Sequence, residues 1–547
     1  MSPAQTQALA IRLTQFKSVT NTEGESGFGP FLREVLLENP YFQARPEQVW
    51  LEPTLDDPFE RSNVFALVKG RTSKTLILTG HYDVVSTANY GILEALATEP
   101  EALRAALIAE LGVKRRNAAE EKALSDLESG LFLPGRGLLD MKSGLAAGMA
   151  VLDRWAQEPE HDLNLLFIAV PDEEVASYGM RSAVRQLPAV CGRWGLEPVC
   201  AVNLDVHADP GDGSEGRAIF LGSVGKMLPF VLFVGRPTHV GAVFDGVNPS
   251  LLMAEFVRRL EANPSFGDPP GQAEYPAPPA VLYARETRTH YDVTTPHTAF
   301  CAVNLLTHSR GPQEVLQSVR QLAGESLNAA LELLRARAAE HSRRGGVPVT
   351  LSSGDCRVLD FAELKALAQA KDPAEVGAIL EQTLPGGDGV ERSQAIAQAL
   401  VRLAGLEGTA AVVGFAPPFY PRAELDPLAN AAFLKILRDA AEEVGTETGE
   451  GVRLAAYFPG ISDMTFLNPA DAGAEAAVAA QTPTARPVGP LEQLGCPVVN
   501  IGPWGREYHQ KLERVQVRYA FETVPELLWR VARAVERDSL PSVEPPA

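Results

Sequence analysis

The sequence predicts an α/β fold in which a mixed, mostly parallel sheet is covered by helices. Short apolar runs typical of strands alternate with segments of helical spacing up to about residue 210. Such alternation is typical of parallel strands joined by crossover helices. The chain has 547 residues, too many for one typical domain. After about residue 217 the alternation of single strands and helices gives way to paired strands and long helical segments. We therefore expect a second, α+β domain inserted into the first.

The first domain is expected to contain four strands and two helices before the insertion. These strands lie at 63–68, 75–79, 163–170 and 199–204, and the helices at 141–155 and 175–186. The inserted domain is expected to hold a helix at 250–261, a proline-rich loop at 263–280, and helical tracts at 313–343 and 361–403. A helix at 425–444 and strands at 452–457 and 497–501 then complete the first sheet.

Domain boundaries follow from this order of elements. We assign 1–210 and 421–547 to one discontinuous domain, and 211–420 to the inserted domain. The inserted domain is enlarged by a helical insertion at about 311–410.

Composition narrows the classes of partner and location. The formal net charge of -20 argues against nucleic acid and anionic membranes, which would be repelled over much of the surface. No run of about 20 apolar residues is present to span a bilayer, and the N-terminus reads as an amphipathic helix rather than a signal peptide. The five cysteines have no paired C-x-x-C spacing, which favours reduced thiols. We expect a cytoplasmic enzyme or binding protein.

Polar side chains interrupt the apolar strand T-L-I-L-T-G-H-Y-D-V-V at its end. His81 and Asp83 are two residues apart, so on a strand they share one face. An aspartate in this position can accept the second ring N–H of a metal-binding histidine and fix its tautomer. Taken alone, the pair is also compatible with an ordinary strand end without a metal.

Further carboxylates follow other predicted strands or precede a helix. Asp140 lies in G-R-G-L-L-D-M-K-S-G, Glu173 and Glu174 end P-D-E-E, and Asp205 ends N-L-D. Adjacent side chains diverge at a strand end, so one glutamate can bind a metal while its neighbour serves as a base. So many carboxylates at one sheet edge would repel one another unless protonated or neutralised by cations. Three ligand carboxylates would nearly balance two divalent ions and leave one positive charge for a bridging hydroxide, and the His and carboxylate donors suit zinc, cobalt or manganese.

These motifs, taken in order with the late His509, resemble those of the M20 family of metallopeptidases and amidohydrolases. The segments 88–103 and 126–137 look like a longer connection found in the arginine-utilisation branch of that family. The resemblance implies a zinc-exopeptidase-like catalytic domain at 1–210 and 421–547, and a lid or dimerisation domain at 211–420.

The resemblance also implies a role for each site residue. Asp140 matches the aspartate that bridges two metal ions, most often zinc. The other implied ligands are His81 and Asp205 for one ion and Glu174 and His509 for the other. Asp83 is implied to orient a metal-binding histidine, and Glu173 is implied to act as the general base. His239 is implied to contact the substrate carbonyl, and Ser462 and Asp463 to lie in a loop that lines the substrate pocket.

The activity implied is hydrolysis of an amide bond in a small peptide or N-acyl amino acid, with arginine-related compounds among the candidates. In the family the metal ions lower the pKa of a water and polarise the carbonyl, while the base moves the proton. The alternative is a catalytically silent binding or interaction protein of arginine metabolism, but that reading predicts a lost ligand or base, and none is lost.

Three further features of the family bear on this chain. The bridging aspartate is followed by a cis peptide bond, here expected between Asp140 and Met141. In dimeric members the lid histidine acts in the partner's site, so we expect a homodimer with His239 acting in trans; an enlarged lid that imitates the partner is the alternative. Asp292 and Asn304 depart from the usual lid pattern, which leaves the group that binds the substrate carboxylate unassigned.

Overall fold

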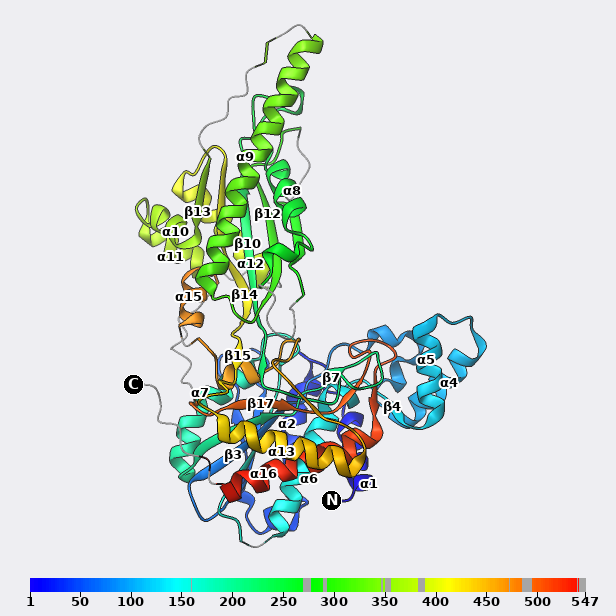
Figure 1. The fold of residues 1–547 in the computed structure, drawn as a ribbon. Helices are drawn as coiled ribbons and strands as arrows, with labels where there is room; N and C mark the ends of the chain where they lie inside the picture. The colour runs from blue at the N-terminus through cyan, green and yellow to red at the C-terminus, as the bar shows by residue number, and fades with distance from the viewer. Residues whose placement is uncertain are drawn as a thin grey trace. The chain divides into compact units, whose positions relative to one another are not determined.

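The computed structural model describes residues 1–158, 160–268, 277–288, 293–345, 348–349, 356–381, 389–471, 473–484, 494–538 and 540. The chain divides into two compact units (Figure 1). The first comprises Met1–Ser223, Ala423–Ala470 and Glu492–Ala547, and the second comprises Val224–Arg422 and Asp471–Leu491. Residues 211–223 thus belong with the first unit and 471–491 with the second.

An eight-stranded sheet forms the centre of the first unit. Its order is β1 (Val49–Pro53), β2 (Ser62–Val68), β5 (Asn164–Val170), β3 (Lys74–His81), β6 (Glu197–Asn203), β17 (Val498–Ile501), β8 (Ala218–Phe220) and β16 (Arg453–Ala455). The central strands β5, β3, β6 and β17 are parallel, whereas β1, β2 and β8 run antiparallel to neighbours. The predicted mixed, mostly parallel sheet is confirmed.

Helices cover both faces of this sheet. The helices that share one apolar core with it are α1 (Pro3–Gln15), α2 (Glu23–Leu37), α6 (Ser143–Gln157), α13 (Ala431–Thr448) and α16 (Val524–Asp538). On the other face, Trp194 of α7 (Tyr178–Trp194) stacks on Trp50, which in turn stacks on Phe65 of β2. The expected N-terminal helix is present as α1, where Ser2 and Gln5 form a capping box.

Three of the predicted helices begin later than their apolar spacing suggested, and one of them, α7, begins at Tyr178 rather than 175. α6 begins at Ser143 rather than 141, because Asp140 and Met141 have non-helical backbone angles. α13 begins at Ala431 rather than 425, because the Asp426 side chain accepts hydrogen bonds from the N–H groups of Leu428 and Ala429 in a turn. Local side-chain hydrogen bonds of this kind compete with helix formation.

A smaller sheet of four strands stands beside the main sheet in the first unit. Its order is β4 (Phe132–Pro134), β19 (Arg514–Gln516), β18 (Trp504–Arg506) and β7 (His207–Ala208). The helices α4 (Pro100–Val113) and α5 (Ala118–Ser129) pack on each other around a core of their own and form the light-blue lobe in Figure 1. Other short elements are α3 (Pro40–Gln43), β9 (Gly222–Ser223), β15 (Ala423–Glu424) and α14 (Met464–Leu467).

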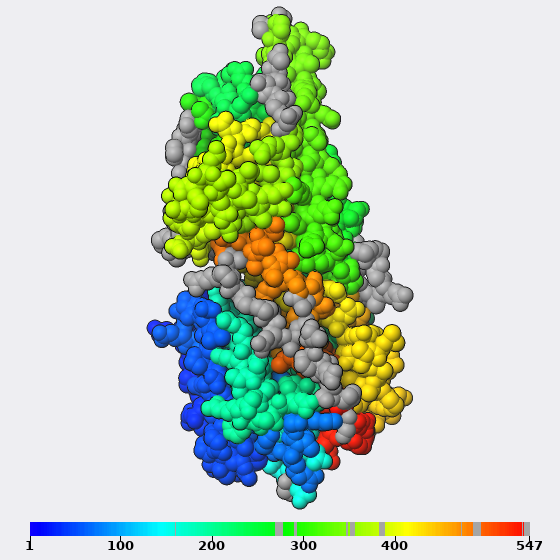
Figure 2. Space-filling model, turned by 90° about the vertical axis from the view of Figure 1, so that its left-hand side faces the viewer, coloured from blue at the N-terminus to red at the C-terminus, as the bar shows by residue number. Residues whose placement is uncertain are grey.

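The second unit is built on a five-stranded sheet with helices on both faces. Its order is β11 (Ala280–Glu286), β12 (Thr298–Thr307), β10 (Gly225–Val234), β14 (Ala410–Tyr420) and β13 (Arg357–Asp360). One face packs against α8 (Pro249–Leu260) and α9 (Pro312–Gly345), and α15 (Ala474–Ala480) joins that core. The other face packs against α10 (Phe361–Gln369), α11 (Pro373–Glu381) and α12 (Gly389–Ala404), whose yellow-green surface is seen in Figure 2.

The helical insertion expected at 311–410 thus consists mainly of α9 and the three helices α10 to α12. Asn304 lies within β12, whereas Asp292 lies outside the described residues. Within the described part of the chain, no helix combines the length and apolarity that crossing a bilayer requires.

Candidate metal centre

His81 is the last residue of β3 and its side chain is buried. Its Nδ1 lies 3.0 Å from the main-chain carbonyl oxygen of Asp83 and 3.5 Å from the Asp83 carboxylate. A carbonyl can only accept a hydrogen bond, so Nδ1 carries the proton of the neutral ring. Nε2 is then the nitrogen left to bind a metal ion, and it lies 3.1 Å from Asp140 Oδ1, which accepts a hydrogen bond from it when the ring is protonated. The ring is thus held in a metal-binding orientation, with the backbone of Asp83 as the nearest acceptor.

Asp140 lies between the two histidines. It belongs to the turn η3 (Leu138–Lys142), and the peptide bond that joins it to Met141 is cis, as expected. Its Oδ1 atom faces His81, whereas its Oδ2 atom lies 3.2 Å from His509 Nε2. Each oxygen of one carboxylate therefore faces a different histidine, which is the arrangement that a bridging ligand needs.

Two groups of candidate ligands share Asp140. One group is His81, Asp140 and Asp205, and the other is Asp140, Glu174 and His509. Within each group the ligand atoms all lie within 4.8 Å of one another. The structure thus brings together the five residues that the sequence motifs suggested as ligands. The first and the last of them, His81 and His509, are 428 positions apart in the chain.

Asp205 follows β6 and is fixed by an asparagine of the neighbouring strand. Asn500 of β17 accepts a hydrogen bond from the Asp205 N–H at 3.0 Å and donates one to the Asp205 carbonyl at 2.8 Å. The sequence analysis missed Asn500, although an amide inside the apolar run V-V-N-I was a signal. Buried polar groups on a central strand need partners, and here the Asn500 amide is paired with the backbone of a candidate ligand, Asp205.

His509 lies in the loop between β18 and β19, in a left-handed backbone conformation with φ of 63°. Its N–H donates to Glu513 Oε2 at 3.1 Å, and the Gly137 N–H donates to Glu513 Oε1 at 3.1 Å. Arg136 also pairs with Glu513. This buried glutamate, which the sequence analysis also missed, therefore ties the loop of His509 to the segment that leads to Asp140.

Glu173 and Glu174 follow β5 and diverge, as expected for adjacent residues. Glu174 Oε2 lies 3.0 Å from His509 Nε2, whereas Glu173 Oε2 lies 3.9 Å from His81 Nε2. Both backbone N–H groups donate to the Asp83 carboxylate, at 3.0 Å from Glu173 and 3.3 Å from Glu174. Glu174 belongs to a group of candidate ligands, and Glu173 does not.

The electrostatics of the site reflect an excess of buried carboxylates. Burial raises the pKa of Asp205 to about 7, and the charge of Asp140 adds to this shift. Burial also raises the pKa of Glu173 well above its ordinary value, and Asp205 and Asp463 act in the same direction. Burial opposes a charge on the His509 ring, but hydrogen bonds to Asp140 and Glu174 raise its pKa to about 10. The cluster therefore holds protons in the absence of cations.

Divalent cations fit this cluster. Cations would replace the protons and neutralise carboxylates that otherwise repel one another. Imidazole and carboxylate donors with no thiolate among them suit zinc, cobalt or manganese.

The remaining predicted residues have different surroundings. The buried Ser462 accepts a hydrogen bond from Asn203 at 2.7 Å, and the neighbouring Asp463 is buried close enough to influence Glu173. His239 lies in the second unit, where it is exposed and caps the short helix η4 (Val240–Ala242). His207, which is not among the predicted site residues and lies two positions after Asp205, packs against the rings of Phe220 and Phe458 in a small aromatic cluster.

Comparison with known proteins identifies the family. The model of peptidase family M20/M25/M40 matches residues 119–482, two thirds of the chain. This chain belongs to that family. The matched span contains Asp140, Glu173, Glu174 and Asp205. Membership in the M20 family makes the chain a hydrolase that acts on C–N bonds.

Two Bacillus subtilis proteins resemble the chain over almost its whole length. The uncharacterized protein YqjN is 31% identical, with 95% of this chain and 94% of YqjN covered. Protein RocB is 28% identical, with 96% of this chain and 94% of RocB covered. A succinyl-diaminopimelate desuccinylase of Methylorubrum extorquens is 28% identical over 49% of this chain and 60% of its own length.

Solved structures support the M20 fold. A tripeptidase from Staphylococcus aureus superimposes with a TM-score of 0.53 at 13% identity, covering 98% of this chain and 99% of its own. The M20 metallo-carboxypeptidase Sso-CP2 from Sulfolobus solfataricus gives a TM-score of 0.51 at 12% identity, covering 97% and 99%. At these identities the likeness concerns the fold alone.

Proposed function

We propose that this M20 hydrolase cleaves an amide bond in a small peptide or an N-acyl amino acid with the help of two divalent metal ions. The observation that carries the proposal is the position of Asp140, whose two carboxylate oxygens lie 3.1 Å from His81 and 3.2 Å from His509. One carboxylate shared by two groups of donors is typical of a two-metal site.

Five residues would hold the ions. Asp140 would serve both, together with His81 and Asp205 on one side and Glu174 and His509 on the other. When bound, such ions lower the pKa of a water molecule and polarise the carbonyl of the substrate. We propose zinc as the most suitable ion, with cobalt and manganese as alternatives that the same donors accept.

Glu173 is proposed as the general base. Its carboxylate lies beside His81 but belongs to neither group of ligands, and burial raises its pKa well above the ordinary value. A carboxylate with a raised pKa can take a proton from an attacking water and pass it to the leaving amine. Asp83 is proposed to position this base, because its carboxylate accepts the N–H groups of Glu173 and Glu174.

The lid histidine completes the proposal. His239 would help to stabilise the oxyanion that forms on the substrate carbonyl. We further propose a homodimer in which His239 acts in the partner's site, as the resemblance to dimeric members of the family implies.

Screening for activity tests the proposed reaction. Metal-loaded protein would be incubated with dipeptides, tripeptides, N-succinyl amino acids and acylated arginine derivatives, and released amine would be measured. The N-succinyl compounds are included because of the similar desuccinylase, and the arginine derivatives because of the segments 88–103 and 126–137. We expect turnover of at least one class that is lost with a chelator and restored by metal.

A matched variant guards this screen against contaminating hydrolases. Glu173→Gln protein, purified and loaded in the same way, should be inactive on every compound that the native protein cleaves. Equal activity of the two preparations would contradict the proposal, as would binding of the compounds with no turnover by fully loaded native protein.

A further inference from the structure

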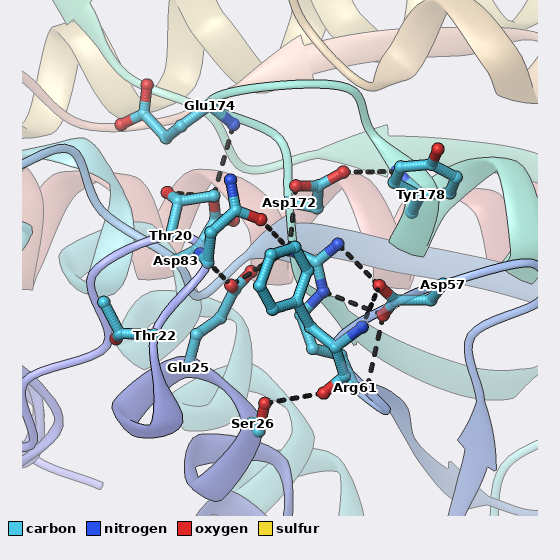
Figure 3. Close-up of polar contacts among 12 residues, drawn as sticks. Thr20, Thr22, Glu25, Ser26, Asp57, Arg61, Asp83, Asp172, Glu174 and Tyr178 are labelled. Carbon is cyan, nitrogen blue, oxygen red and sulfur yellow. Dashed lines mark hydrogen bonds and ion pairs between the residues drawn. The ribbon is translucent and has the colours of Figure 1, made fainter. Parts of the chain in front are cut away.

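A buried arginine next to the P-D-E-E turn has no part in the proposed chemistry. Arg61 directly precedes β2, and its side chain is completely buried. Three carboxylates surround it: its Nη1 lies 2.9 Å from Glu25 and 2.8 Å from Asp172, and its Nε lies 2.8 Å from Asp57 (Figure 3). All three carboxylates are as buried as the arginine. Burying a guanidinium together with three carboxyl groups is costly, so the cluster requires a reason.

The partners of Arg61 come from three separate parts of the chain. Asp57 lies in the loop before β2 and binds the guanidinium with both oxygens, since Oδ1 also accepts from Nη2 at 2.9 Å. Glu25 lies in the first turn of α2. Asp172 lies in the turn after β5, immediately before Glu173. The planar guanidinium, with its five donors, can bind both oxygens of Asp57 and still reach Glu25 and Asp172, whereas a lysine has only three donors.

Asp172 in turn organises the turn that carries the two glutamates. Its Oδ2 accepts the Tyr178 N–H at 3.0 Å at the start of α7. Its carbonyl accepts the N–H groups of Ala176 at 3.2 Å and Ser177 at 2.6 Å. The residue itself has a φ of 70°, a conformation that a non-glycine residue rarely adopts without support from its surroundings.

Asp83 holds the same turn from the other side. Its carboxylate accepts the N–H groups of Glu173 and Glu174, and it also accepts the Thr20 hydroxyl at 2.9 Å. Figure 3 shows the Glu174 backbone directed at Asp83 while the Glu174 carboxylate points away from it. Three consecutive residues of the turn are therefore held in place: Asp172 by Arg61, and the N–H groups of Glu173 and Glu174 by Asp83. This leaves the two glutamate side chains to face the candidate metal centre.

We propose that Arg61 is a positioning residue which, through Asp172, holds the P-D-E-E turn so that Glu173 and Glu174 keep their separate places at the site. This inference rests on the proposed function for the roles of the two glutamates, but the restraint on the turn is independent of it. Misplacing a catalytic group by about 1 Å can reduce turnover by about a hundredfold, so such a restraint matters for rate.

Asp172→Asn and Asp57→Asn form a matched pair of variants. Each removes one buried carboxylate charge from the same guanidinium while preserving side-chain shape, so both are expected to lower stability by similar amounts. Only Asp172 belongs to the turn. Loss of the Asp57 charge leaves Nη1 bound to Glu25 and Asp172.

The first measurement is amide hydrogen exchange in the metal-free proteins, which needs neither metal nor substrate. We expect exchange at Glu173 and Glu174 to be at least about tenfold faster in Asp172→Asn than in the native protein, and unchanged in Asp57→Asn. Native exchange rates at these amides in Asp172→Asn would overturn the inference, whatever the protein is found to hydrolyse.

The second measurement separates kcat from KM on a substrate found by the screen. We expect kcat to fall between about tenfold and a hundredfold in Asp172→Asn with KM nearly unchanged, and to change little in Asp57→Asn. Arg61→Lys retains a buried cation and provides a second folded test, with the same expected loss of kcat. Native kcat in both Asp172→Asn and Arg61→Lys would overturn the inference, whereas an inactive native protein would contradict the proposed function alone.

Discussion

Two adjacent glutamates with similar chemistry lie in different surroundings because their side chains leave the turn in different directions. Glu174 lies 3.0 Å from His509 within a group of candidate ligands, whereas Glu173 lies 3.9 Å from His81 and outside both groups. The division depends on the backbone N–H groups, both of which Asp83 holds.

Exchange of each glutamate for glutamine should separate their proposed tasks. Glu173→Gln should retain its metal content but lose at least about a hundredfold in kcat, the usual scale for loss of a general base. Glu174→Gln should bind metal more weakly at the site of His509, because an amide is a poorer ligand than a carboxylate. Metal analysis alongside kcat checks both, and loss of metal from Glu173→Gln alone would mean that the roles are reversed.

The titrating residues of the site predict how pH affects the metal-free protein. Folding raises the pKa of Asp205 from 3.8 to about 7 and that of His509 from 6.5 to about 10. Both groups bind more protons in the folded state, so their contribution to stability is complete at low pH and is lost as pH rises through the folded values. Asp140, whose pKa is lowered, acts oppositely but only below its ordinary value of 3.8.

Metal binding must displace these protons, so the stabilisation by metal should grow with pH. The rise in Tm on loading zinc into chelator-treated protein should therefore be larger at about pH 8 than at about pH 6. Differential scanning calorimetry at both values measures this. A larger rise at the lower pH would show that the titrating cluster is not where the metal binds.

At the scale of elements, the close packing of α6 on the end of β6 positions Asp205. A Cβ atom at Gly144 of α6 would lie 2.2 Å from the main-chain oxygen of Leu204, which directly precedes Asp205. A backbone atom cannot move aside as a side chain can. The glycine is therefore needed for the approach of the helix to the strand rather than for any turn.

Gly144→Ala should consequently destabilise the protein by about 1–3 kcal/mol, although alanine favours a helix more than glycine does. Gly192→Ala in α7 is the matched control, because a Cβ atom there meets nothing within 4 Å. That variant should gain up to about 1 kcal/mol from helix propensity. Urea denaturation compares the two, and a stable Gly144→Ala variant would contradict the packing described for this helix.

The elements show which features a single sequence can reveal. Apolar runs and periodicity located the central strands, because burial on both faces of a parallel sheet leaves a continuous apolar signal. Polar residues at the ends of those runs indicated His81, Glu174 and Asp205, whereas Asp140 was indicated by the motif G-R-G-L-L-D-M-K-S-G before a helix. Arg61 and Glu513 gave no such signal, because their partners lie far away in the chain and only the fold brings these buried charges together.

At the scale of the whole molecule, the chain divides between a unit that contains every candidate metal ligand and a unit that contains His239. The proposal that His239 acts in the site of a partner chain depends on how the protein assembles, and variants can test it.

Mixing two inactive variants tests the proposed action in trans. Glu173→Gln lacks the base, and His239→Ala lacks the lid histidine, so each homodimer should be inactive. If His239 acts in the partner's site, a mixed dimer contains one site with both residues intact, so each mixed dimer should have about half of the activity of a native dimer. No recovery after confirmed subunit exchange would contradict the proposal, as would a monomer by light scattering at the assay concentration.

The central claim is that Asp140 is shared by two metal ions, and anomalous diffraction at the zinc edge from crystals of fully active, zinc-loaded protein tests it most directly. We expect two anomalous peaks about 3.5–4 Å apart, one beside His81 and Asp205 and the other beside Glu174 and His509, with the Asp140 carboxylate between them. A single peak in fully active protein, or peaks remote from Asp140, would contradict the claim.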